Sequence, residues 1–165
     1  MDYQQVALTA PEVEPLLTGL RQEYEARYGA GAGDSVLDVE PQEFEAPTGA
    51  FVVLMDGDRT VAGGGLRRID DETVEIKRMW TNPDYRRQGH ALRLLRELAG
   101  LAGQLGYTTV RLETGHAQPE ALALYRGLGF TEIDSYGPYE HAAAFEFGVD
   151  AVTTTPRHSA RAREL

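Results

Sequence analysis

A short basic stretch, YRRQGHALRLLREL at residues 85–98, places a glycine and several arginines directly before an amphipathic segment. A helix N-terminus leaves backbone N–H groups without partners and carries a partial positive charge. Gly89 allows left-handed torsion angles and the close approach of a ligand, so the amides that follow it can bind an anion. The stretch therefore predicts a phosphate or pyrophosphate site. A glycine that only begins a helix, with arginines that face solvent, is the alternative interpretation.

Basic residues near this stretch form a cationic island in an otherwise acidic chain: Lys77, Arg78, Arg86, Arg87, Arg93 and Arg96. The whole chain has 16 lysines and arginines against 26 aspartates and glutamates, which gives a net charge of -10. This charge argues against general binding of nucleic acid, whose phosphates need a basic surface. It is compatible with cationic small molecules as ligands.

The absence of cysteine excludes disulfides, thiolate zinc sites and a cysteine nucleophile. The histidines show no metal-ligand spacing: His90, His116, His141 and His158. We therefore predict no metal ion.

The N-terminal sequence MDYQQVALTAPEVEPLL has an acid where a signal peptide needs cations. No stretch approaches the length of a membrane span. We therefore expect a cytoplasmic protein that does not bind a membrane. Residues 1–149 are predicted to form a single domain, and the aperiodic residues 150–165 a mobile C-terminal tail.

Hydrophobic periodicity and turn residues divide the chain into strands and helices. The predicted strands are 3–8, the two arms of a hairpin at 49–69, 72–80, 107–115 and 142–149. The predicted helices are 11–29, the helix that begins within 85–98 and runs to Gly106, and 119–128, with one short helix allowed within 36–47. This order predicts an α/β domain with a parallel crossover from strand 72–80 to strand 107–115. Ligands of such sheets bind at the carboxyl ends of strands.

Two motifs in this order resemble those of the GNAT superfamily of acyl-CoA-dependent N-acetyltransferases. Arg86-x-x-Gly89-x-Ala91 has the [Q/R]-x-x-G-x-[G/A] form, and QPEALALYRGLGFTEI at 118–133 is similar to the later N-x-x-A-x-x-L-Y-x-x-x-G-F signature. The resemblance implies a GNAT fold, with a mixed central β-sheet of six to seven strands flanked by about four helices. It also implies that strands 73–81 and 107–114 splay apart.

The resemblance further implies acetyl-CoA as co-substrate. The amides of Gln88 to Ala91 would hold its pyrophosphate, and the strand edge at 79–81 would pair with its pantetheine arm. Gln118 stands where the family usually has Asn, and His90 where Ile is common. The cofactor-binding residues expected on this basis are Met79, Trp80, Thr81, Arg86, Arg87, Gln88, Gly89, His90, Ala91 and Gln118.

Direct attack of an amine on a thioester needs a base for the amine and an acid for the leaving thiolate. Tyr125 resembles the general acid of the family, and an amphipathic core tyrosine is its structural alternative. Glu75 matches in position the catalytic glutamate of the histone-acetylating branch, and a salt bridge with Lys77 or Arg78 is the alternative. Other acids and a histidine stand in reserve as bases: Glu72, Glu113, Glu132 and His116.

The resemblance therefore implies an acyltransferase that moves an acetyl group from acetyl-CoA to a primary amine in a ternary complex. The acidic balance of the chain favours a small cationic amine as acceptor. A non-catalytic GNAT-fold module that binds a partner or senses an acyl-CoA is the alternative function. A homodimer is common in the family, so the resemblance also allows a homodimer of this protein.

Overall fold

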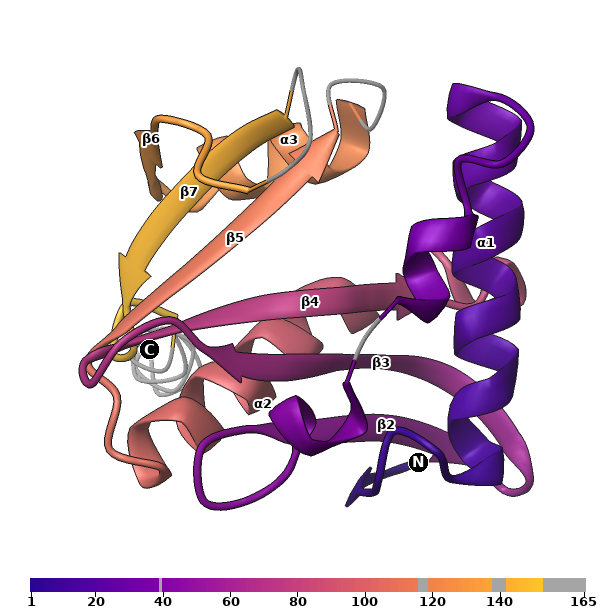
Figure 1. Ribbon diagram of the computed structural model, residues 1–165, viewed down its shortest axis with the longest axis horizontal. Helices are drawn as coiled ribbons and strands as arrows, with labels where there is room; N and C mark the ends of the chain where they lie inside the picture. Colours follow the sequence, from indigo (N-terminus) through magenta and orange to yellow (C-terminus); the bar gives the residue numbers. More distant parts are fainter. Residues whose placement is uncertain (39, 116–118, 138–141, 153–165) are drawn as a thin grey trace, which may run out of the picture.

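The computed structural model describes residues 1–38, 40–115, 119–137 and 142–152. Its strands join one sheet of seven in the order β1-β2-β3-β4-β5-β7-β6 (Figure 1). The strands are β1 (Asp2–Gln5), β2 (Ala50–Asp56), β3 (Arg59–Arg68), β4 (Thr73–Thr81), β5 (Thr109–Gly115), β6 (Thr131–Ile133) and β7 (Ala142–Gly148). The predicted sheet of six to seven strands is confirmed. Strand β6 was not predicted, because so short a segment carries no readable alternation.

The described residues contain three α-helices: α1 (Glu14–Tyr28), α2 (His90–Gln104) and α3 (Pro119–Gly127). Short 3-10 turns accompany them: η1 (Pro11–Val13), η2 (Asp34–Leu37), η3 (Pro41–Phe44) and η4 (Pro83–Tyr85). The prediction of about four helices was therefore one too high for this part of the chain. The acidic segment 36–47 does not form a single helix, because Pro41 disfavours helical torsions at the residue before it, and Glu40 is extended.

Strands β2 and β3 form the predicted hairpin, and β4 continues the antiparallel arrangement. The chain then crosses through α2 to β5, which pairs with β4 in parallel as predicted. This pairing runs only from Thr73↔Thr109 to Ile76↔Leu112. Beyond it β4 and β5 diverge in Figure 1, so the predicted splay is confirmed.

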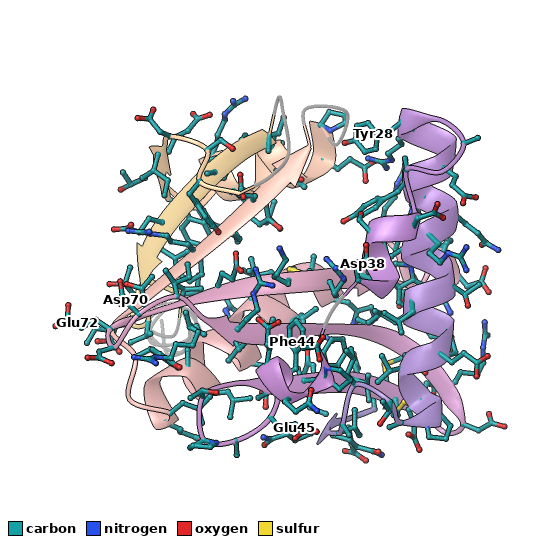
Figure 2. All side chains as sticks on the ribbon, in the orientation of Figure 1. Tyr28, Asp38, Phe44, Glu45, Asp70 and Glu72 are labelled. Atoms are coloured by element: carbon teal, nitrogen blue, oxygen red, sulfur yellow. The ribbon has the colours of Figure 1, made fainter. Side chains whose placement is uncertain are left out.

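Helices α1 and α2 cover opposite faces of the sheet. Figure 1 shows α2 behind the strands and α1 in front of the end at which β4 finishes. The buried face of α2 presents His90, Leu94, Leu95, Leu98, Ala99 and Ala102, the spacing of an amphipathic helix. Full burial of one leucine side chain contributes about 1.5–3 kcal/mol to folding. The α1 side has its own core, in which Leu16 and Leu20 pack with Phe44 and Trp80; Phe44 lies in front of the sheet in Figure 2.

Strand β4 contains a bulge that decides which face its last residues use. The register of β3 against β4 shifts between Gly63 and Gly65, and Arg78 takes a left-handed φ of 59°. The Arg78 side chain donates hydrogen bonds to the carbonyl oxygens of Val36, at 3.2 Å, and Ser35, at 2.9 Å. After the bulge Met79 packs with the α2-side core and Trp80 with the α1-side core.

Within the described residues no helix is both long and apolar enough to cross a bilayer. The expected tail at 150–165 starts with turn residues 150–152, and its remainder, 153–165, lies outside the described residues.

Candidate functional site

Among the described residues, the end of β4 has a strand partner on one edge only. β3 pairs with Trp80 through Gly63 and with Thr81 through Ala62. On the other edge, the pairing of β4 with β5 ends at Ile76 within the described residues. An unpaired edge presents backbone N–H and C=O groups that an extended ligand can bind as if it were a strand. The expected cofactor residues at 79–81 lie on this edge.

The turn before α2 exposes the helix N-terminus. Arg87 has a φ of 63° and Gly89 a φ of 81°, so the chain turns through two left-handed residues. Gly89 is the N-cap of α2, where no side-chain cap hydrogen bond is made, and the hydrogen bond from Arg93 N to Gly89 O, at 3.2 Å, begins the helix. The N–H groups that precede Arg93 therefore have no intrahelical acceptor. This arrangement fits a pyrophosphate at the predicted amides of Gln88 to Ala91.

Arg86 connects the turn before α2 to strand β4 and helix α1. Its Nε donates to the carbonyl oxygen of Thr81 at 3.2 Å, and its guanidinium forms an ion pair with Glu23 of α1. Arg87 is exposed. The predicted cationic island is thus divided: Arg86 holds the turn against β4 and α1, whereas the Arg87 side chain points into solvent.

His90 faces the core and not the exposed turn. Its side chain is 3% exposed, and neither ring nitrogen has a hydrogen-bond partner among the described residues. The ring packs edge-to-face with Tyr85, with centroids 6.3 Å apart. Burial, followed by the charge of Arg93, lowers the pKa of His90. Only the backbone N–H of His90 is therefore placed to meet a ligand.

Tyr125 meets the splayed edge from the α2 side of the sheet. Its side chain is 6% exposed, and its ring packs on Phe130 and, at 5.5 Å between centroids, on Phe145. The hydroxyl lies 3.8 Å from Met79 Sδ. Burial, and then repulsion between the ionised forms of Tyr125 and Tyr24, raise the pKa of Tyr125 to about 12. The residue is both a core aromatic and a protonated hydroxyl beside the predicted cofactor edge.

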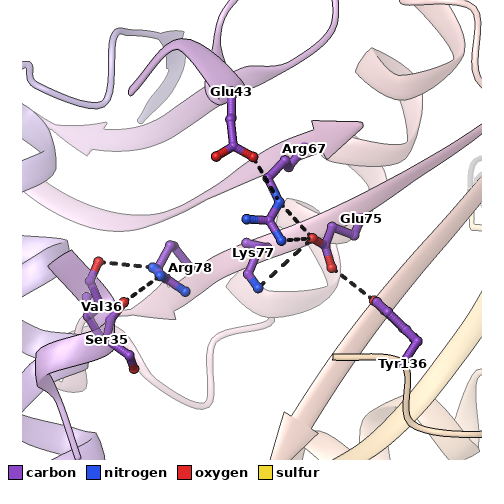
Figure 3. A network of polar contacts seen from close by, with 8 residues as sticks. All are labelled: Ser35, Val36, Glu43, Arg67, Glu75, Lys77, Arg78 and Tyr136. Carbon is purple, nitrogen blue, oxygen red and sulfur yellow. Dashed lines mark hydrogen bonds and ion pairs between the residues drawn. The ribbon is translucent and has the colours of Figure 1, made fainter. Parts of the chain in front are cut away.

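Glu75 lies in a network of polar groups on the opposite side of β4 (Figure 3). Its carboxylate is buried, and Oε1 accepts a hydrogen bond from Arg67 Nε at 2.8 Å. Lys77 Nζ lies 4.0 Å from the same oxygen, and Tyr136 Oη donates to Oε2 at 3.2 Å. The expected salt bridge with Lys77 therefore exists, whereas Arg78 binds carbonyl groups elsewhere.

The structure does not bring Glu75 and Tyr125 into contact. The neighbours of Glu75 in β4, Val74 and Ile76, both belong to the α2-side core. Because side chains alternate along a strand, Glu75 points to the α1 side. Tyr125 and Met79 meet on the α2 side. The two predicted catalytic residues thus lie on opposite faces of the sheet, near the place where β4 and β5 separate.

A cavity of about 470 Å³ adjoins Glu75 on the α1 side. It is lined by Glu43, Arg67, Arg68, Ile69, Glu75, Lys77, Tyr136 and Gly137. Tyr136 belongs to the segment between β6 and β7, and Ser135 in that segment donates to Glu113 at 2.7 Å. Burial and the carboxylates of Glu75 and Glu113 raise the pKa of Tyr136 well above its ordinary value. It is therefore a hydrogen-bond donor to Glu75.

Arg67 was missed by the sequence analysis, although a signal for it exists. Arg67 and Glu75 are direct cross-strand partners in the β3–β4 ladder. Aligning the hairpin arm with strand 72–80 in register would have paired the two charges.

Of the reserve bases, Glu113 accepts a hydrogen bond from Ser135 and lies near Tyr136, so it adjoins the cavity at Glu75. The others lie elsewhere or outside the described residues. Glu72 is at the turn between β3 and β4, at the end of the sheet away from α1 in Figure 2. Glu132 is paired with Arg126 at 3.4 Å and is exposed. His116 and the expected cofactor residue Gln118 lie outside the described residues. Within the described part of the chain, no group of three or more metal-binding side chains could hold an ion.

Residues 17–130 match the family model described as Acetyltransferase (GNAT) family. The chain is 30% identical over 129 residues to Uncharacterized N-acetyltransferase YjgM of Escherichia coli K12, covering 73% of this chain and 77% of that protein. It is 35% identical over 85 residues to human N-acetyltransferase 8, covering 48% of this chain and 37% of that protein. It is 39% identical over 82 residues to the IAA acetyltransferase of Azospirillum brasilense, covering 48% of this chain and 54% of that protein. The chain thus spans about half or less of these last two relatives.

Solved structures share the fold. An acetyltransferase from Streptococcus agalactiae superposes with a TM-score of 0.71 at 19% identity, covering 88% of this chain and 96% of that chain. A GNAT family acetyltransferase from Elizabethkingia anophelis with acetyl-CoA bound superposes with a TM-score of 0.64 at 17% identity, covering 89% of this chain and 97% of that chain.

Proposed function

The chain belongs to the GNAT acetyltransferase family, and from this premise we propose that it transfers an acetyl group from acetyl-CoA to a primary amine in a ternary complex. One observation carries the proposal. The splay between β4 and β5 lies beside a buried tyrosine hydroxyl on one face, at Tyr125, and beside a polar cavity on the other, at Glu75. A donor and an acceptor can therefore approach the same gap from two sides, as direct transfer requires.

The residues of the turn and of the β4 edge are proposed to hold acetyl-CoA, which supplies an activated acetyl thioester. The amides of Gln88 to Ala91 would bind the pyrophosphate at the N-terminus of α2. Backbone groups of Met79, Trp80 and Thr81 would hold the extended arm. The acetyl-CoA in the Elizabethkingia structure supports this choice of ligand for a protein of the same fold.

Tyr125 is proposed as the general acid. The C–N bond to the amine forms as the C–S bond breaks, and the leaving sulfur takes the Tyr125 proton. The amine starts as an ammonium ion and loses two protons in all. The thiol product keeps the proton from Tyr125. One proton from the amine restores Tyr125 through solvent, and the other is released to solvent. With a pKa raised to about 12, Tyr125 stays protonated at neutral pH and can donate.

Glu75 is proposed as the group that takes up the amine proton at Oε2, the oxygen that faces Tyr136. Arg67 and Lys77 hold the carboxylate in place through Oε1. The alternative, a non-catalytic module, would bind acetyl-CoA without turnover. His90, which stands where the family commonly has Ile, gives that alternative no support. Its side chain is buried away from the turn, so it leaves the proposed cofactor site unchanged.

The test compares two variants of the turn residue Gly89. Asn and Asp are nearly the same size and both tolerate left-handed torsions. Gly89→Asp adds a negative charge where the phosphates should bind, whereas Gly89→Asn does not. We expect affinity for CoA, measured by thermal shift, to be at least about tenfold weaker in the Asp variant than in the Asn variant.

Turnover is then measured as release of free thiol from acetyl-CoA with a panel of primary amines. Equal CoA affinity in the two Gly89 variants would place the cofactor elsewhere. Binding of CoA with no thiol release for any amine would leave the non-catalytic module as the function.

A further inference from the structure

The cavity at Glu75 has a defined position relative to the splay. Glu75 and Lys77 line it and flank Ile76, the last residue of β4 that pairs with β5. Both side chains point to the α1 side, away from Tyr125. An acceptor in this cavity would therefore approach the gap from the face opposite to the proposed acid. The chemistry of the lining then bears on which amine the protein accepts.

The lining holds charges of both signs, and they are already paired. Arg67 lies between two carboxylates, 2.8 Å from Glu75 and 3.4 Å from Glu43. Lys77 adds a second cation 4.0 Å from Glu75. The lining as a whole has three cations, Arg67, Arg68 and Lys77, against two carboxylates, and Asp71 outside the lining pairs with Arg68, so the charges of these groups cancel. In a chain with a net charge of -10, this cavity is locally not acidic.

This balance disfavours an acceptor that is only cationic. A polyamine brings only positive charge to a lining in which Arg67 already binds both carboxylates and Lys77 adds a further cation. An acceptor that is only anionic would meet Glu43 and Glu75. A ligand that carries one charge of each sign suits a wall on which the signs alternate.

The lining of the cavity also offers both hydrogen-bond donors and hydrogen-bond acceptors. Arg67 uses Nε and Nη2 for Glu75, and no partner for its Nη1 is found among the described residues. An arginine edge of this kind binds a carboxylate with charge-assisted hydrogen bonds. Tyr136 donates its proton to Glu75, so the lone pairs of its Oη remain able to accept from an ammonium group.

We propose that the acceptor is an amino acid or a similarly small amino carboxylate, a primary amine that itself carries a carboxylate. Arg67 and Lys77 bind the carboxylate, and the amine lies toward Tyr136 and Glu75. The outer cation Arg68 is held at the rim by Asp71. This inference rests on the proposed acetyl transfer, and it names the substrate class of that reaction.

The first experiment compares matched acceptors at saturating acetyl-CoA, with thiol release as readout. Leucine, leucine methyl ester and 3-methylbutylamine present an amine on similar apolar groups, but only leucine has a free carboxylate. Equivalent sets are made for other side chains, and spermidine is included. We expect kcat/KM for the best amino acid to exceed that of its ester and its decarboxylated amine at least tenfold. Equal or higher kcat/KM for the ester, the amine or spermidine overturns the inference and leaves acetyl transfer standing.

The second experiment changes Lys77, 4.0 Å from Glu75, and keeps Arg67, which binds Glu75 more closely, at 2.8 Å. Lys77→Met removes the charge, and Lys77→Arg keeps it as the matched control. We expect the ratio of kcat/KM for the amino acid to that for its decarboxylated amine to fall at least tenfold in the Met variant and to be kept in the Arg variant. An unchanged ratio in Lys77→Met overturns the role of Lys77 in binding the carboxylate. If the wild-type protein releases no thiol with any acceptor, the proposed acetyl transfer itself is overturned.

Discussion

Tyr125→Phe separates the chemical role of the hydroxyl from the structural role of the ring. The phenyl ring keeps its packing on Phe130 and Phe145. The hydroxyl has one weak partner among the described residues, Met79 Sδ at 3.8 Å. The substitution therefore removes a poorly satisfied polar group from the core and the proposed acid from the reaction.

The two effects have opposite signs. A buried hydroxyl without a good partner costs about 1–3 kcal/mol, so Tyr125→Phe should leave stability unchanged or raise it by up to about 2 kcal/mol. For a domain of this length 1 kcal/mol changes Tm by about 2–4 °C. Loss of the general acid should lower kcat by about 10²–10⁴-fold, which is about 2.7–5.4 kcal/mol in the activation barrier.

Tyr107→Phe is the matched control. Tyr107 is also 6% exposed, but its hydroxyl donates to the carbonyl oxygen of Thr48 at 2.6 Å. Its removal should cost about 0.5–1.5 kcal/mol and leave kcat unchanged.

The assay combines thermal unfolding with thiol release at saturating substrates and with CoA affinity from thermal shift. We expect Tyr125→Phe to be slow, at least as stable as the wild type, and unchanged in CoA affinity. Because the pKa of Tyr125 is raised to about 12, the wild type should keep its activity without an alkaline loss from this group below about pH 10. A Tyr125→Phe variant with wild-type kcat would refute the acid, and a large loss of stability would refute the packing argument.

Four further substitutions test other parts of the protein. Glu75→Gln should slow thiol release most at low pH, where the amine is most protonated, and recover partly as pH rises; a wild-type pH profile would reduce Glu75 to an ion-pair partner. Because burial holds the pKa of His90 below its ordinary value of 6.5, the unfolded chain binds the proton first, so unfolding free energy should fall as pH drops below about 6.5. His90→Leu should lose less Tm between pH 7.5 and 5.0 than the wild type; equal losses would contradict this. A Cβ at Gly19 would lie 2.5 Å from Trp80 Nε1, so Gly19→Ala should cost about 1–3 kcal/mol in unfolding free energy, whereas Gly100→Ala, with open space around its Cβ, should gain about 1 kcal/mol; a neutral Gly19→Ala would show that the indole can move.

The sequence by itself determined the features that depend on local chemistry. The turn at 86–91 was predicted from one glycine before an amphipathic run, and Gly89 does begin α2 in a left-handed conformation. The hairpin followed from the turn residues within 49–69, and the parallel crossover to β5 followed from the order of strand, helix and strand. These inferences succeed because neighbouring residues fix torsion angles and connectivity. The roles of the site residues remain predictions.

The tertiary structure decided which side chains meet. Residues distant in the chain, such as Tyr136 and Glu75, touch for reasons that no local pattern records. The bulge at Arg78 turns Met79 toward Tyr125, and an unbroken alternation would have placed Met79 on the same face as Glu75. The net charge of the chain does not give the charge of the cavity, because the total sums every exposed acid, whereas a ligand responds to the few groups within a Debye length of about 8–10 Å. Only the packed structure places Tyr136 on Glu75 and Glu43 on Arg67, and so decides which charged groups line the cavity.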